Sequence, residues 1–169
     1  MSESAIEVLP PLPAGRFEGR VAFQQLVRDA LDCAAREGWK EITLSDATFE
    51  DWPLGERAVV DSLQAWATRG RRMTLLARRY DAVLRQHARF VTWRQTWGHL
   101  IECHACAAAD PLELPSAIWS PGWVMLRLDP VRSIGQTGDE PSRRLLLKES
   151  LGEWIGKSSP GFPASTLGL

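Results

Sequence analysis

The chain has 169 residues, 44% of them hydrophobic and 24% charged, which predicts one folded domain rather than a disordered chain. Its net charge of -1 provides no overall field that would attract nucleic acid or an acidic membrane. The sequence has no run of about 18 apolar residues and no N-terminal secretory signal, and its three cysteines lack a disulfide-framework spacing. We therefore expect a cytoplasmic protein with no membrane span.

The first third of the chain predicts an arm followed by a helix, a strand and a second helix. Prolines at positions 10, 11 and 13 indicate an extended arm over residues 1–18. From Gly19 to Glu37, apolar residues recur with the three-and-four spacing of an amphipathic helix, which Gly38 should end. Lys40–Asp46 has the alternation of a strand, and Glu56–Thr68 has the spacing of another helix.

A second strand is predicted over Met73–Ala77. A strand, a helix and a strand in succession indicate two parallel strands, whose carboxyl ends share one edge of the sheet. Ligands of open α/β sheets usually bind at that edge. The predicted phosphate- or ligand-binding residues there are Asp46, Asp51, Trp52, Arg78 and Arg79. We favour a structural interpretation, in which the carboxylates and Glu50 pair with the two arginines and Trp52 covers the edge as a lid.

Positive charge is concentrated between residues 62 and 100, which contain eight arginines and one acidic residue, whereas residues 1–61 contain 12 acidic and 6 basic residues. These arginines, called the arginine block below, are Arg69, Arg71, Arg72, Arg78, Arg79, Arg85, Arg89 and Arg94. Guanidinium groups suit two-pronged contacts with carboxylate or phosphate. We favour pairing between the arginine block and the acidic first third, and nucleic-acid binding is the alternative.

The rest of the chain is predicted as short elements. They are a helix over 80–88, strands over 90–93 and 100–107, a hairpin of 117–119 with 123–128, a loop over 129–138 and a helix starting at Pro141. Residues 158–169 should form a tail. The predicted fold is therefore a single α/β domain over residues 19–157, with a mixed, partly parallel sheet flanked by helices.

His99, Cys103, His104 and Cys106 are the densest group of metal-ligand types. Strand alternation places Cys103 and His104 on opposite faces, and Cys103 and Cys106 as well. We therefore expect no metal and no cofactor.

Several features occur in a fixed order along the chain: Asp46 at a strand end, Asp51-Trp52-Pro53-Leu54-Gly55 before a helix, the basic strand Arg71–Leu76, a histidine strand and a final helix. This order resembles a half-repeat of the phospholipase D superfamily. More narrowly, the chain is similar to a bacterial branch of single-repeat domains with an Asp-Trp-Pro-Leu-Gly stretch. The resemblance implies a phospholipase D-like fold and a homodimer, because members of the superfamily pair two halves.

Active members of that superfamily use His-x-Lys and a downstream aspartate, with histidine attacking phosphorus and lysine binding phosphate oxygens. The nearest match here is His104-Ala105-Cys106 with Asp110, in which cysteine replaces lysine and the aspartate comes one residue early. The resemblance therefore implies a degenerate site. We expect a non-catalytic binding or interaction module, with an anionic or phosphate-containing ligand as a candidate. The alternative is a phosphodiesterase that uses His104 as nucleophile or base, with Arg78 and Arg79 holding the phosphate.

Overall fold

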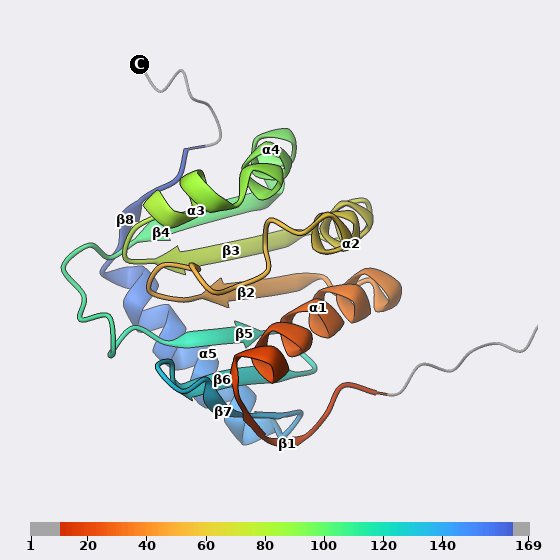
Figure 1. Cartoon of the computed structure of the whole chain (residues 1–169), viewed down its shortest axis with the longest axis vertical. Coiled ribbons are helices and arrows are strands. Elements are labelled where there is room, and N and C mark those ends of the chain that lie inside the picture. Colours follow the sequence, from red (N-terminus) through yellow and green to blue (C-terminus); the bar gives the residue numbers. More distant parts are fainter. Residues whose placement is uncertain (1–10, 164–169) are drawn as a thin grey trace, which may run out of the picture.

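The computed structural model describes residues 11–163, which form an α/β fold around one eight-stranded mixed sheet (Figure 1). The strand order is β1-β7-β6-β5-β2-β3-β4-β8. The strands are β1 (Gly15–Glu18), β2 (Glu41–Ser45), β3 (Arg72–Ala77), β4 (Ile101–Ala105), β5 (Ser116–Trp119), β6 (Val124–Asp129), β7 (Ile134–Gly138) and β8 (Ser159–Pro160). The predicted fold class is therefore confirmed.

The centre of the sheet is parallel and its flanks are antiparallel. β2 pairs with β3 in parallel, with Ile42 opposite Met73, and β3 pairs with β4 in parallel, with Leu75 opposite Cys103. β5 joins β2 in the antiparallel sense, so the sheet changes direction there. The predicted parallel pair and its shared carboxyl edge are confirmed.

Helices cover both faces of the sheet. They are α1 (Arg20–Glu37), α2 (Arg57–Ala67), α3 (Asp81–Gln86), α4 (Ala88–Thr96) and α5 (Pro141–Gly156), with a short 3-10 turn over Gly98–Leu100. α1 to α4 lie on one face and α5 lies on the other (Figure 1). Within residues 11–163, no helix is both long and apolar enough to cross a membrane.

Each face has its own apolar core. The larger core, under α1 to α4, buries Phe23, Phe49, Trp52, Trp66 and Phe90 among others. The smaller core joins Leu147 and Leu151 of α5 to sheet residues that include Leu76, Trp119 and Val124. Strand alternation explains the division, because Val124 faces α5 whereas its neighbour Met125 belongs to the larger core.

Several predicted elements differ from the structure. Residues 90–93 belong to helix α4 rather than to a strand, since Phe90 and Trp93, three apart, both pack into the larger core. The predicted loop 129–138 contains strand β7, whose polar, glycine-containing sequence is held by pairing with β1 on one side and β6 on the other. Leu84 of α3 and Leu146 of α5 are apolar but exposed.

The sheet also extends beyond the predicted domain limits at 19 and 157, because β1 and β8 are its two edge strands. The predicted arm covers residues 1–18, of which 1–10 lie outside the described residues. Its described part lies against the domain, where the carbonyl oxygen of Pro13 accepts hydrogen bonds from Trp123 Nε1 at 2.9 Å and Thr137 Oγ1 at 2.8 Å. Half of the predicted tail, residues 164–169, is likewise outside the described part.

Candidate functional site

The loop that follows β2 is shaped by Asp46. Its Oδ2 accepts hydrogen bonds from the backbone N–H groups of Thr48 at 3.1 Å and Phe49 at 2.8 Å. This turn holds Phe49 at a φ of 58°, a left-handed conformation that bulky residues rarely adopt. The other carboxylate oxygen of Asp46 is thereby available to β6.

Arg127 of β6 is the centre of a buried ion network. Its Nη2 donates to Asp46 Oδ1 at 2.9 Å and to Asp51 Oδ1 at 3.2 Å, and its Nη1 donates to Asp51 Oδ2 at 2.6 Å. Hydroxyl oxygens accept the remaining bonds, Ser116 from Nε at 3.0 Å and Ser133 from Nη1 at 3.3 Å. These five contacts match the five N–H donors of a guanidinium group. We call Arg127, Asp46, Asp51, Ser116 and Ser133 the Arg127 network.

The Arg127 network is almost entirely shielded from water. The side chains of Arg127 and Asp46 are 2% and 7% exposed, whereas that of Asp51 is 21% exposed. The guanidinium also lies over the ring of Phe23, 3.9 Å from its centroid, a favourable cation–π contact. The positive charge of Arg127 contacts the negative charges of Asp46 and Asp51. Asp51 is the ionic member of the network that is partly exposed to solvent.

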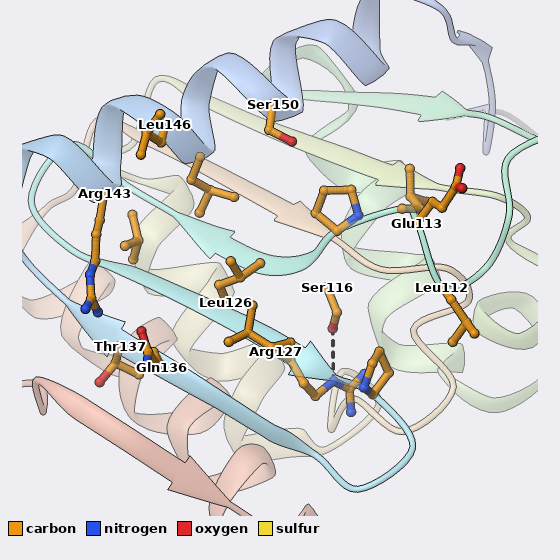
Figure 2. A pocket seen from close by; sticks show the side chains of 16 residues that line it. Leu112, Glu113, Ser116, Leu126, Arg127, Gln136, Thr137, Arg143, Leu146 and Ser150 are labelled. Carbon is orange, nitrogen blue, oxygen red and sulfur yellow. Dashed lines mark hydrogen bonds between the residues drawn. The ribbon is translucent and has the colours of Figure 1, made fainter.

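Two cavities lie on either side of the Arg127 network. The first, called the α5 cavity, has a volume of about 400 Å³ and lies between α5 and strands β5 to β7 (Figure 2). The second, called the edge cavity, has a volume of about 530 Å³ and lies at the carboxyl end of β2, beside Asp46, Glu50 and Asp51. Arg127 and Ser116 line both cavities, so the network forms the wall between them.

Comparison with known proteins identifies a fold but no family. No family model matches the chain, and no curated protein matches it. Among solved structures, it is similar to TrmBL2, an archaeal chromatin protein that binds DNA, with a TM-score of 0.67 and 18% sequence identity. The match covers 92% of this chain and 56% of TrmBL2, so the chain spans little more than half of that protein. At this identity the likeness shows a shared fold.

The predicted ligand-binding residues are only partly brought together. Asp46 and Asp51 meet in one network, as expected of the edge, but their cation is Arg127 rather than Arg78 or Arg79. Arg78 instead donates to the carbonyl oxygens of Ala109 at 2.5 Å and Ala107 at 3.4 Å, which fixes the loop after β4. Arg79 is exposed.

The arginine block as a whole does not pair with the acidic first third of the chain. Within residues 11–163, its one ion pair joins Arg72 to Glu102, at 3.0 Å. Arg94 is buried and donates to the carbonyl oxygens of Gly98 and Phe162, and Arg89 donates to that of Gly55. The predicted compensation is therefore wrong, because backbone carbonyls take the place of the expected carboxylates.

Trp52 belongs to the core. Its side chain is 1% exposed and packs edge-on against Phe23 and Phe49, with ring centroids 5.5 and 4.9 Å away. The indole therefore packs the loop that follows β2 against α1, and its ring faces are not available for stacking with a ligand. Trp52 therefore has a structural role, as predicted, but it is a buried core residue and not a lid over the sheet edge.

His104 lies on β4, as predicted, but it lines neither cavity. Its Nδ1 is 3.0 Å from Ser158 Oγ, and its Nε2 is 3.5 Å from Glu102 Oε2. The Ser158 hydroxyl donates to the carbonyl oxygen of Ile155 at 2.6 Å, so its oxygen accepts a hydrogen bond from the N–H of His104 Nδ1. His104 therefore cannot act as the base for Ser158 in this arrangement. Hydrogen bonding to Arg72 lowers the pKa of Glu102, which keeps this carboxylate ionised.

The cysteines show no sign of activation. Burial raises the pKa of both Cys33 and Cys103 to about 11, so their thiols stay protonated at neutral pH. Among the described residues, no three His, Cys, Asp or Glu side chains gather in a way that could hold a metal ion.

Sequence reasoning missed Arg127, although a signal was present. Met125 and Arg127 of β6 alternate with Trp123, which directly precedes the strand, so the three share one face, and Trp123 and Met125 are core residues. An arginine in line with such residues is expected to be buried, and a buried guanidinium requires oxygen acceptors, either carboxylates or carbonyl groups. The pattern identifies the residue but not its partners.

Proposed function

We propose that this chain is a non-catalytic, phospholipase D-like binding module whose ligand site is the α5 cavity. The observation that carries the proposal is the cavity itself, with a volume of about 400 Å³ and walls that are mainly apolar. Small-molecule sites have this size and character, with a few polar groups that orient the ligand. The cavity also adjoins the Arg127 network, which gives it a rigid inner wall.

The lining indicates a small amphipathic ligand with an acidic group. Val124, Leu126 and Leu147 supply apolar wall, and Thr137 and Ser150 supply hydroxyl groups. Arg143, on the first turn of α5, is the cation of the lining that the Arg127 network does not use (Figure 2). Its Nε lies 3.6 Å from Glu140, a loose and partly exposed pair that an anionic ligand could replace. This chemistry agrees with the anionic ligand expected from the sequence.

The phosphodiesterase alternative has less support. A nucleophilic histidine needs a cation to bind the phosphate oxygens. His104 has Ser158 and Glu102 as its nearest polar partners, and Arg78 is bound to carbonyl oxygens of the loop after β4. A binding role does not require a nucleophilic histidine next to a phosphate-binding cation.

The α5 cavity can be tested with the fluorescent probe 1-anilinonaphthalene-8-sulfonate, which has an apolar body and one sulfonate. We expect saturable binding to the folded protein. Ser150→Phe places a ring in the cavity from α5 and should weaken binding at least about tenfold through steric exclusion. Glu149→Phe is the matched control, because Glu149 is the preceding, exposed residue of the same helix and does not line the cavity.

The measurement should be paired with circular dichroism melting, since the same probe also binds partly unfolded states. Equal binding by the wild-type protein and a folded Ser150→Phe variant would contradict the proposal. The absence of saturable binding by the folded wild-type protein would contradict it as well.

We further propose a homodimer, on the resemblance to a superfamily that pairs two halves. Sedimentation velocity at micromolar concentration should then give twice the 18.9 kDa mass of the chain. A monomer across the whole concentration range would exclude it.

A second candidate function is DNA binding. It is supported by the shared fold with TrmBL2, a DNA-binding chromatin protein, and by basic residues that gather at one edge of the sheet. The arginine block itself is divided, with Arg71 and Arg72 at the amino end of β3 and Arg78 and Arg79 beyond its carboxyl end. A DNA surface therefore has to be sought at one edge rather than over the whole block.

A further inference from the structure

Basic residues gather at the amino end of the parallel strands, the edge opposite the Arg127 network. The backbone N–H groups of Arg71 and Arg72 both donate to the carbonyl oxygen of Lys40 at 3.1 Å, which joins the start of β3 to the start of β2. Lys40 Nζ lies 3.5 Å from the carbonyl oxygen of Arg69. The chain positions of three exposed cations, Lys40, Arg69 and Arg71, therefore lie close together at this edge.

α5 brings two more cations to the same lysine. Lys40, Arg144 and Lys148 line one groove of about 470 Å³, together with Trp119. Arg144 is held in place because its Nε donates to the carbonyl oxygen of Asp139 at 3.0 Å and its Nη1 donates to that of Pro121. Lys148 Nζ lies over the ring of Trp119, 5.1 Å from its centroid. We call Lys40, Arg69, Arg71, Arg144 and Lys148 the amino-edge surface.

The charge of the amino-edge surface is not compensated. Within the described part of the chain, none of its five cations lies within ion-pair distance of a carboxylate. The groove contains one acidic residue, Glu41, and nearby Glu102 is paired with Arg72. The opposite edge differs, because there the carboxylates of Asp46, Glu50 and Asp51 line the cavity.

We propose that the amino-edge surface binds the phosphate backbone of duplex DNA. The inference rests on the second candidate function and assigns it a place. The five cations come from three segments of the chain, so they suit a row of phosphates better than a single phosphate group. Trp119, the aromatic residue of the groove, offers no open face to unstacked bases, because it is 7% exposed and Lys148 lies over its ring. Backbone contacts without base contacts predict binding that is independent of sequence.

The proposal can be tested by fluorescence-anisotropy titration of the full chain with two duplexes of about 20 base pairs that have unrelated sequences. Because the proposed contacts are to phosphates alone, we expect equal affinity for the two duplexes. The logarithm of the association constant should fall linearly with the logarithm of salt concentration, with a slope of about -0.9 for each phosphate contacted. Five contacts therefore predict a slope of about -4.5.

The amino-edge surface is tested by charge reversal. Lys40→Glu with Arg71→Glu should weaken binding at least about tenfold and flatten the salt slope by about 2, since two phosphate contacts are lost. Arg79→Glu with Arg85→Glu is the matched control, because it changes two exposed arginines of the arginine block away from this edge by the same charge. The control pair should change the affinity less than about twofold at moderate salt, where charges beyond a Debye length are screened.

The possible results distinguish failure of the amino-edge assignment from failure of the proposed DNA binding. If DNA binds but the two pairs of substitutions weaken it equally, the amino-edge assignment is wrong while the second candidate function stands. If folded protein shows no binding at low salt, both fail. Tighter binding to a single strand than to the duplex would overturn the backbone-only mode.

Discussion

Replacing Arg127 by methionine is expected to lower the free energy of unfolding by about 3–5 kcal/mol, the usual cost of removing one partner from a buried ion pair. The reason is specific to this network. Asp46 and Asp51 would stay in a region where the arginine side chain is 2% exposed, without the cation that both of them contact. Urea unfolding followed by circular dichroism measures the change.

Two further variants show whether charge is the cause. Arg132→Met removes an exposed arginine, 3.1 Å from Asp129, and should cost less than about 1 kcal/mol. Adding Asp46→Asn and Asp51→Asn to Arg127→Met should restore part of the lost stability, because the uncompensated carboxylates are then gone. A cost near that of Arg132→Met would show that the buried network contributes little, and a triple variant less stable than Arg127→Met would show that charge is not the cause.

Trp52→Ala is the second large effect, with an expected loss of about 3–5 kcal/mol from the cavity that the missing indole leaves. The indole packs against Phe23 of α1 and against Phe49 in the loop that follows β2. Its loss therefore removes apolar contact area and also the support that keeps Phe49 in its left-handed conformation. The same urea titration gives the magnitude.

Substitution by phenylalanine separates packing from hydrogen bonding. Among residues 11–163, Trp52 Nε1 finds no hydrogen-bond partner, whereas Trp66 Nε1 donates to the carbonyl oxygen of Trp39 at 2.7 Å. Trp66→Phe should therefore cost about 1 kcal/mol more than Trp52→Phe, the net value of one hydrogen bond. If Trp52→Ala left stability unchanged, Trp52 would not be the anchor that its burial indicates.

Much of the scaffold follows from local pattern. The α1 helix has the apolar spacing of an amphipathic helix and ends at Gly38, whose φ of 66° suits glycine. The β5–β6 hairpin is closed by Ser120-Pro121-Gly122, and α5 begins at Pro141. These features depend on residues within a few positions of one another. The sequence was therefore sufficient for them, and for the parallel pairing of β2 with β3.

The misassigned elements depend on contacts that are distant in the chain. β7 carries few apolar residues and becomes a strand because β1 and β6 pair with its two edges. α4 is short, and its position follows from the core into which Phe90 and Trp93 pack. Local propensity is weak in both segments, so tertiary contacts decide their structure.

The candidate site divides in the same way. The placement of Asp46 and Asp51 at the carboxyl end of a buried strand is predictable from local sequence, because it follows from strand length and connection. Their pairing with Arg127, which is 81 residues from Asp46, and the cavity under α5 depend instead on how the strands and helices pack together. Pairing across such a separation is set by the order and register of the sheet. The local sequence around a residue does not specify which strand will pair with the strand that contains it.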